Sequence, residues 1–124
     1  MSNKKLTAKQ NALLHLQEER EKLIEPFLKN DELTEGSYVE VLQKCGRPGC
    51  HCEKRPTHLV SRVSKWIDGK LKHKVVRIED RDQVRKLVEI YKRHKTAMTK
   101  LAKGAQKEKE IMNAIIKLKN RPYE

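Results

Sequence analysis

The sequence is poor in aromatic residues, in cysteine and in long apolar runs. Aromatic side chains make up 4% of its 124 residues, and the hydrophobic share of 36% is no larger than the charged share of 37%, so the expected core is small. The lack of any run of about 18 apolar residues excludes a membrane-spanning helix. Because no apolar signal-peptide segment follows Lys4 and Lys5, we expect a cytoplasmic protein that has no membrane partner.

Residue sets typical of enzymes are missing as well. No paired carboxylates, Ser/His/Asp set or phosphate-binding loop stands out, and acidic residues are sparse near the basic centre of the chain. An odd number of cysteines excludes a complete disulfide framework, and neither the C-x-x-C redox pattern nor the C-x-x-C-H haem pattern occurs. We therefore expect a protein that is not an enzyme.

All three cysteines nevertheless lie within eight positions. With one histidine they form the pattern C-x4-C-x-C-x5-H, made of Cys45, Cys50, Cys52 and His58. Three thiolates and one imidazole suit the tetrahedral preference of Zn²⁺, and because they fill all four positions the predicted metal is structural. The side chain of His51, between two ligands, is expected to point away. The alternatives are a redox or nucleophilic thiol, an inert cluster or another metal.

The net charge of +12 is the strongest global feature. Residues 36–79 hold ten basic and four acidic side chains, and residues 80–124 hold thirteen and six, which gives +6 and +7. Such an excess favours polyanionic partners, and we predict that the partner is nucleic acid, either RNA or DNA. The alternative is a charged surface that only keeps the protein dissolved.

Helical spacing of apolar residues predicts an amphipathic helix over residues 7–29. Thr7 is a suitable N-cap, and Pro26 is expected to kink or end the helix near Glu25, because proline disfavours helical geometry at the residue before it. Residues 30–37 are expected to form a linker.

Three strands are predicted next. They cover residues 38–44, 58–67 and 71–78, and Asp68-Gly69 is a strong signal for a type I′ hairpin between the last two. A two-residue loop predicts the pairs Ile67–Lys70, Trp66–Leu71, Ser64–His73, Arg62–Val75 and Val60–Arg77. The face that carries Leu59, Val63, Ile67, Val76 and Ile78 is the expected core. The opposite face then exposes Arg62, Trp66, His73 and Arg77.

A long helix is predicted over residues 80–119, with Asp80 and Asp82 at its N-terminus. Apolar residues recur every seven positions at Val84, Tyr91, Met98, Ala105 and Met112, a coiled-coil-like pattern. This helix is much longer than the first one. Its end is therefore expected either to pair with a second chain in a homodimer, which we favour, or to fold back after a break near Gly104.

The predicted fold class is α+β. It comprises an N-terminal helix (7–29), a small three-stranded antiparallel sheet stapled by zinc (36–78) and a long coiled-coil-like helix (80–119), in a single domain over residues 1–124. The function predicted is a non-catalytic, zinc-containing nucleic-acid-binding protein, whose basic hairpin contacts the phosphate backbone while the helices set spacing or oligomeric state. The alternative is a zinc-stapled coiled-coil scaffold or accessory subunit that binds a protein partner.

The predicted nucleic-acid contacts surround the cysteine cluster and the hairpin. They are Arg47, Lys54, Arg55, Arg62, Lys65, Trp66, Lys70, Lys72, His73, Lys74 and Arg77. Trp66 and Tyr38 are available to stack on bases, although burial of Trp66 in the core is an equal alternative.

The segment Cys45-Gly-Arg-Pro-Gly-Cys50-x-Cys52, with Gly36-Ser37-x-Val39 before it and Leu59-Val60-Ser61-Arg62 after it, resembles a family of small uncharacterised prokaryotic proteins. Those proteins share a C-G-K/R-P-G-C-x-C segment, and the resemblance covers residues 36–100. It implies a metal site made of cysteine and histidine, and it implies no activity. The family usually has a Gly-Pro-Tyr-like run after the histidine, where this chain has Leu59-Val60.

Overall fold

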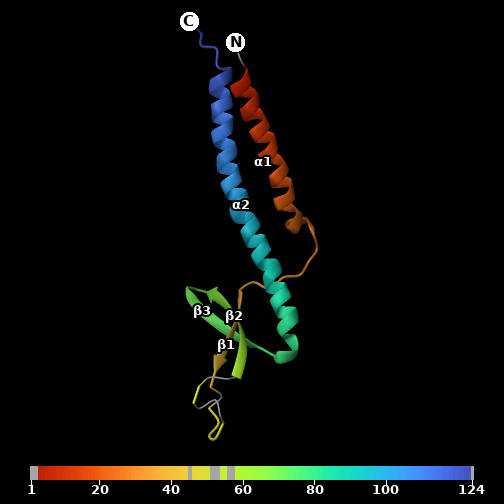
Figure 1. Cartoon of the computed structure of the whole chain (residues 1–124), viewed down its shortest axis with the longest axis vertical. Helices are drawn as coiled ribbons and strands as arrows, with labels where there is room; N and C mark the ends of the chain where they lie inside the picture. Colours follow the sequence, from red (N-terminus) through yellow and green to blue (C-terminus); the bar gives the residue numbers. More distant parts are fainter. Residues whose placement is uncertain (1–2, 45, 51–53, 56–57, 124) are drawn as a thin grey trace. The chain divides into compact units, whose positions relative to one another are not determined.

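A computed structural model describes residues 3–44, 46–50, 54–55 and 58–123 of the chain. The elements are α1 (Lys4–Leu28), β1 (Ser37–Gln43), β2 (His58–Ile67), β3 (Lys70–Val76), the 3₁₀ turn η2 (Ile78–Asp80) and α2 (Arg81–Lys119) (Figure 1). The predicted α+β class is confirmed as a helix, a three-stranded antiparallel sheet and a long helix, while the zinc staple remains a prediction. No helix among the described residues is long and apolar enough to cross a membrane.

The chain divides into two compact units. One, the helix unit, comprises Met1–Asn30 with Arg93–Glu124, and the other, the sheet unit, comprises Asp31–Lys92. Helix α2 contributes its first residues to the sheet unit and the rest to the helix unit. The single domain predicted for residues 1–124 stays a prediction.

In the sheet unit, β2 lies between β1 and β3, and both pairings are antiparallel. The register at the hairpin is the predicted one, with Ile67 opposite Lys70 and Trp66 opposite Leu71. The loop residues Asp68 and Gly69 have φ angles of 51° and 77°. Positive φ at both central positions is what a type I′ turn requires, so the Asp-Gly signal is confirmed.

The last predicted pair of the hairpin is wrong, because the β2–β3 ladder ends at the pair of Ser61 and Val76. Val60 instead lies opposite Val41 of β1. Arg77 has left the strand and precedes the 3₁₀ turn that leads into α2. The chain therefore leaves the sheet earlier than its β-branched residues indicated.

The first turns of α2 cover one face of the sheet. The Arg85 guanidinium lies 5.8 Å from the centroid of the Tyr38 ring, and Arg81 Nη2 donates to the Leu59 carbonyl at 2.8 Å. The Tyr38 hydroxyl donates to Glu40 at 2.7 Å and is hydrogen-bonded to the Ser61 hydroxyl at 3.0 Å. Because Ser61 is fully buried, this partner satisfies a hydroxyl that water cannot reach.

The predicted core face is thus the one that the helix covers, but the cover is narrow. Val63 and Val76 are half-buried there. The predicted core residues Leu59, Ile67 and Ile78 are exposed, so their assignment to the core is wrong. A helix is about 10 Å wide, whereas the ten residues of β2 span about 33 Å, and the ends of the strand extend beyond the helix.

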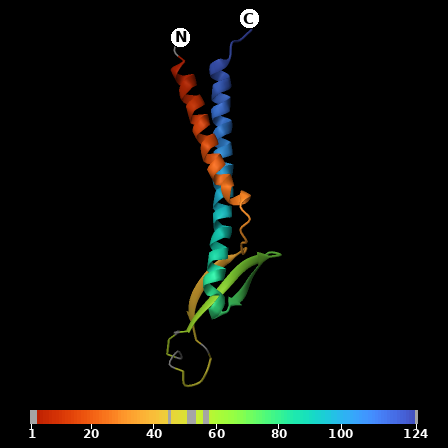
Figure 2. The same ribbon diagram turned by 90° about the vertical axis from the view of Figure 1, so that its right-hand side faces the viewer.

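In the helix unit, α1 runs alongside the C-terminal part of α2 in both views (Figures 1 and 2). The two helices are antiparallel, because Arg20 contacts Glu108 while the later residue Phe27 contacts the earlier residue His94. Arg20 Nε donates to Glu108 at 3.1 Å, and a second guanidinium nitrogen forms an ion pair with the same carboxylate. The rings of Phe27 and His94 meet edge to face at 4.8 Å.

Two expectations for α1 are wrong. The helix begins at Lys4, and the Thr7 N–H donates to the Asn3 carbonyl at 2.8 Å, so Thr7 is not its N-cap. Pro26 does not end the helix near Glu25, because α1 continues to Leu28, while the alternative of a kink there stays a prediction. A proline in the last turn removes a single backbone hydrogen bond, which the helix tolerates so close to its end.

Helix α2 runs without a break through Gly104, so the three-helix alternative is excluded. At about 1.5 Å per residue, its 39 residues span about 58 Å and the 25 residues of α1 span about 37 Å. Within the part of the chain that the structure describes, no third helix therefore covers the exposed apolar side chains on the last part of α2, such as Met112 and Ile116.

We predict that Gly104→Ala stabilises the protein by about 1 kcal/mol, the usual difference between these residues inside a helix. A Cβ atom at Gly104 meets nothing within 4 Å. The measurement is urea unfolding followed by circular dichroism. Gly36→Ala is the matched control and should destabilise, because its φ is +137° and the new Cβ would lie 2.8 Å from the Ser64 carbonyl oxygen. Lower stability of Gly104→Ala would contradict the open space described at this position.

We also predict that Arg20→Ala destabilises the protein by about 1–3 kcal/mol, because it leaves the Glu108 carboxylate buried without its cation. Glu108 is 5% exposed. Replacing both residues with leucine should restore most of the loss, since no charge then remains in the seam between the helices. The same unfolding experiment measures both variants, and equal losses for the single and double variants would refute this account.

Candidate metal centre and nucleic-acid interface

The segment before Cys50 forms a tight turn. The Cys50 N–H donates to the Arg47 carbonyl at 3.3 Å, and Gly49 has a φ of 80°. A proline at the second position and a glycine with positive φ at the third are characteristic of a type II turn. Arg47-Pro48-Gly49-Cys50 is such a sequence, so the backbone preferences of proline and glycine account for the turn that leads to Cys50.

Two of the four predicted metal ligands are described, and they lie together. Cys50 Sγ is 3.3 Å from Nε2 of His58, at the start of β2. Typical Zn–S and Zn–N distances place a sulfur and a nitrogen on one tetrahedral zinc about 3.5 Å apart. The observed distance fits joint ligation, and Cys50 is a free thiol, not part of a disulfide.

The other two predicted ligands, Cys45 and Cys52, lie outside the described residues, as does His51. Among the residues that are described, no group of three or more His, Cys, Asp or Glu side chains is arranged to hold a metal ion. A thiol next to an imidazole is also the arrangement of an activated nucleophile. The Cys50–His58 pair therefore fits both the predicted zinc site and the alternative of a reactive thiol.

The face of the sheet opposite α2 is open and carries the exposed aromatic side chain of the hairpin. Trp66 is 69% exposed, which contradicts the alternative that it is buried in the core. In the strand register, Arg62 and Trp66 of β2 lie on this face with Leu71, His73 and Val75 of β3. The Ser64 hydroxyl and His73 Nδ1 are 2.7 Å apart, which holds the imidazole on the same face. A cation, an indole and an imidazole thus share one surface.

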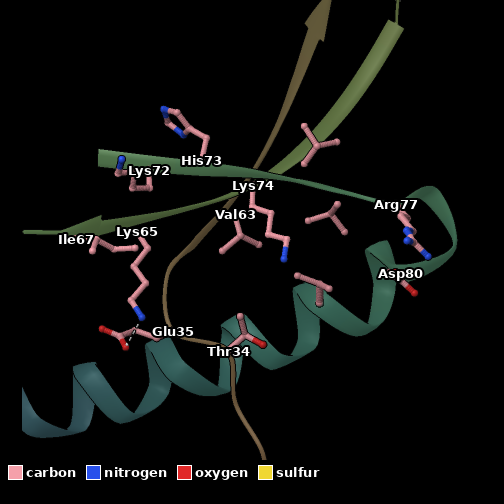
Figure 3. A pocket seen from close by; sticks show the side chains of 13 residues that line it. Thr34, Glu35, Val63, Lys65, Ile67, Lys72, His73, Lys74, Arg77 and Asp80 are labelled. Atoms are coloured by element: carbon pink, nitrogen blue, oxygen red, sulfur yellow. Dashed lines mark ion pairs between the residues drawn. The ribbon is translucent and has the colours of Figure 1, made fainter. Parts of the chain in front are cut away.

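The predicted hairpin lysines face the other way. Alternation along the strands places Lys65, Lys72 and Lys74 on the face that α2 covers. There they line a cavity of about 740 Å³ whose apolar wall includes Val63 and Val84. Figure 3 shows Lys74 extending toward α2, whereas His73, the preceding residue, points away from the helix. The predicted contacts therefore occupy both faces of the sheet.

One of these lysines already has a partner. Lys65 Nζ forms an ion pair with the Glu35 carboxylate at 3.2 Å, drawn as a dashed line in Figure 3. Lys72 and Lys74 are exposed, although they line the cavity. They belong to β3, which lies at the edge of the sheet, so solvent reaches their side chains from that edge.

The remaining predicted contacts lie in the loop before β2 or at the two ends of β3. Arg47, Lys54 and Arg55 are exposed in the loop that contains Cys50, Lys70 opens β3 next to the hairpin turn, and Arg77 is exposed just after β3. Tyr38, which was expected to stack on bases, is on the helix-covered face and is hydrogen-bonded to Ser61, so that expectation is wrong.

Sequence reasoning missed a second basic cluster, in the helix unit. A cavity of about 440 Å³ between α1 and α2 is lined by Lys22, Lys100, Lys103 and Lys107, together with Leu16, Glu19, Leu23 and Gly104. The spacing of three, four and seven between the α2 lysines is the signal that would have placed them on one side of the helix. The anchors Arg81 and Arg85 of the sheet unit were also missed, because the sequence does not identify the carbonyl or the ring that each one contacts.

Comparison with known proteins adds one relationship. A family model with the description "Domain of unknown function (DUF6788)" matches residues 12–86, which include most of α1, the whole sheet and the start of α2. No curated protein and no solved structure matches the chain. The match covers more than half of the sequence and agrees with the expected resemblance to an uncharacterised family. The chain belongs to the family described as "Domain of unknown function (DUF6788)".

Proposed function

We propose that this protein is a non-catalytic nucleic-acid-binding protein whose sheet binds a single strand along its β3 edge. The observation that carries the proposal is the exposure of Trp66 beside Arg62 and His73 on the open face. An indole is costly to leave in water, and a flat aromatic side chain on an open sheet is a platform on which bases stack. Each stacked base contributes about 1–3 kcal/mol to binding.

Phosphate contacts come from both sides of the same edge. Because β3 is an edge strand, a chain that passes along it meets His73 on the open face and Lys72 and Lys74 on the other. Lysine on an edge strand also discourages pairing with another sheet, and this structural role needs no ligand. Strand β3 carries lysine at three alternate positions, Lys70, Lys72 and Lys74. This is more lysine than protection of an edge strand requires. Together with Arg62, these lysines form a row of cations suited to a phosphate backbone.

We propose that Cys45, Cys50, Cys52 and His58 hold a structural zinc ion. The contact between Cys50 and His58 supports this assignment. The four ligands would join the end of β1 to the start of β2, since Cys45 follows Gln43 closely and His58 is the first residue of β2. When bound, zinc would stabilise the folded sheet unit, whose core is small, by linking the loop to the strands. It would also hold Arg47 and Lys54 of the loop near the sheet.

The second candidate is a scaffold or accessory subunit that binds a protein partner. It is favoured by the apolar character of the open sheet face, where Leu71 and Val75 are exposed next to Trp66. In either function the helices set spacing or oligomeric state, and a homodimer through α2 is part of the proposal. Nucleic acid is preferred because Arg62 and His73 share the open face with Trp66, while Lys72 and Lys74 lie on the other side of the same sheet edge. Cations on both sides of one edge are typical of a surface for a polyanion.

We predict that purified protein contains about one zinc ion per chain and that Cys50→Ser or His58→Ala loses most of it. Elemental analysis measures the metal, and a chelator should lower the melting temperature of the unmodified protein because binding and folding are coupled. His51→Ala is the matched control and should keep its zinc. Folded, metal-free protein whose Cys50 reacts rapidly with iodoacetamide at neutral pH would refute the zinc site and favour a reactive thiol.

We predict that Trp66→Ala weakens binding of single-stranded RNA or DNA about 5- to 150-fold, the loss of one stacked base. Its salt dependence should stay unchanged, because no phosphate contact is removed. Arg62→Gln should reduce the slope of log K against log salt by about 0.7, and Lys72→Gln with Lys74→Gln by about twice that. Fluorescence anisotropy over a salt series, with single-stranded and duplex probes, measures all of these changes.

The control for Trp66 is Tyr123→Ala, which removes a fully exposed aromatic ring beyond the end of α2. It should leave binding unchanged. Equal affinities of the unmodified protein and Trp66→Ala would contradict the stacking platform. The absence of salt-sensitive binding to any probe, together with a stable protein partner that Trp66→Ala releases, would select the scaffold function.

A further inference from the structure

The two long edges of the helix pair differ in chemistry. Residues that face the partner helix include Arg20 and Phe27 of α1 and Ala97 and Glu108 of α2. Successive residues turn by about 100° around a helix, so each helix has one flank on either side of this seam. Going around each helix from its seam residues in the direction of increasing residue number leads to one flank, and going the other way leads to the other flank. In an antiparallel pair, the two flanks reached in the same direction lie on the same side of the pair. The pair therefore has two edges, each made of one flank from each helix.

The first edge is basic. It contains the cavity lined by Lys22 of α1 and by Lys100, Lys103 and Lys107 of α2, with Glu19 as the acid among its lining residues. Two copies that met through this edge would bring together four lysines from each chain. Such like-charge contact is unfavourable, so the basic edge does not serve for self-association.

The opposite edge, which we call the apolar edge, carries exposed large hydrophobic side chains. They are Leu14 of α1 and Met98, Met112 and Ile116 of α2, and Ile116 is 64% exposed. Ala105 is seven positions from each of the two methionines, so the methionines and this small residue form one stripe. Among the described residues of α1 none is buried, which is unusual for a helix that is apolar on one side. The two helices alone thus leave the core of this unit incomplete.

We infer that the apolar edge docks a second copy of this chain, so that two helix pairs form an all-antiparallel four-helix bundle in which α1 of each copy lies against α2 of the other. This inference deepens the oligomerisation role proposed for the helices and rests on that part of the proposal. It does not depend on nucleic-acid binding by the sheet.

Charge complementarity identifies a second copy as the occupant. The α1 flank of the apolar edge bears the exposed acids Glu18, Glu21 and Glu25, whereas the α2 flank bears the exposed lysines Lys95 and Lys109. A single chain therefore presents an acidic row and two cations side by side. If α1 of each copy packed against α1 of the other, the acids would meet acids. The arrangement of α1 against α2 brings acids to lysines instead.

The levels along the helices agree with this arrangement. Arg20 lies beside Glu108 and Phe27 beside His94, so the level of any other α1 residue is counted along α2 from the nearer of these two contacts. A two-fold axis parallel to the helices keeps these levels in the second copy. Leu14 of one copy then lies near Met112 of the other. Counted from the contact of Arg20 with Glu108, Glu18 comes within about one helical turn of Lys109. Counted from the contact of Phe27 with His94, Glu25 comes within about one turn of Lys95.

Sedimentation equilibrium of the full-length protein tests the inference. We expect a dimer, and we expect Met98→Glu with Met112→Glu to be monomeric with an unchanged helical circular dichroism spectrum, because both methionines are exposed in the single chain. The matched control is Lys103→Glu with Lys107→Glu, which places the same number of glutamates on the basic edge and should remain dimeric.

A charge exchange tests the arrangement of the helices. Lys109→Glu should weaken the dimer roughly 2- to 30-fold, since two symmetry-related ion pairs of about 0.2–1 kcal/mol each are lost. Adding Glu18→Lys to the same chain should restore much of the affinity, because the pair is re-formed with its signs reversed. Further weakening in the double variant would overturn the packing of α1 against α2.

The outcomes separate this inference from the proposals it rests on. If the protein with both methionine changes is still a dimer, the apolar edge is not the dimer interface, and the dimer forms through another surface. Unmodified protein that is monomeric at the highest concentrations would overturn both the edge and the oligomerisation role. Nucleic-acid binding is read in a separate assay, so its loss or persistence does not affect either result.

Discussion

The packing of the first turns of α2 on one face of the sheet is the contact on which the rest of the sheet unit depends. Ser61 of β2 and Val88 of α2 are the two fully buried side chains of the described chain, and Tyr38, Arg81 and Arg85 anchor the helix to the strands around them. A three-stranded sheet has two faces, and this chain has one helix segment here to cover them. The covered face becomes the core, and Trp66 stays open because it lies on the other.

The same shortage of apolar side chains shapes the helix unit. Two helices offer each other one stripe apiece, and part of that stripe is occupied by the ion pair of Arg20 and Glu108. A buried ion pair contributes little net stability, but loss of one of its two partners is costly because the other charge is left buried alone. The pair therefore specifies the alignment of the two helices more than it strengthens their contact. The apolar side chains that remain exposed, such as Met98 and Ile116, gather on one edge, while lysines gather on the other. A thin core thus produces surfaces with distinct chemistry, and the proposed roles in binding and assembly arise from these surfaces.

Much of this fold could be read from local signals. The alternation of β2 and β3 and the Asp-Gly turn predicted a register that the strands adopt, since a two-residue loop leaves no freedom in pairing. The long helix was predicted through Gly104 as one of two alternatives, and it runs unbroken because one glycine costs only about 1 kcal/mol. Boundaries were less predictable. Thr7 and Pro26 have strong local preferences, yet both lie inside α1, because packing against α2 outweighs the propensity of a single residue.

The sequence by itself determined the alternation that separates Trp66 and His73 from Lys72 and Lys74, since side chains on a strand point to opposite faces whatever surrounds them. It also determined the turn that leads to Cys50, through the demands of proline and glycine on their own backbone angles. Only the tertiary structure decided that Cys50 meets His58, that Trp66 is open to solvent and that Tyr38 is not. These outcomes depend on which face α2 covers and how far it reaches, and such contacts between distant segments leave no periodic signal in the chain.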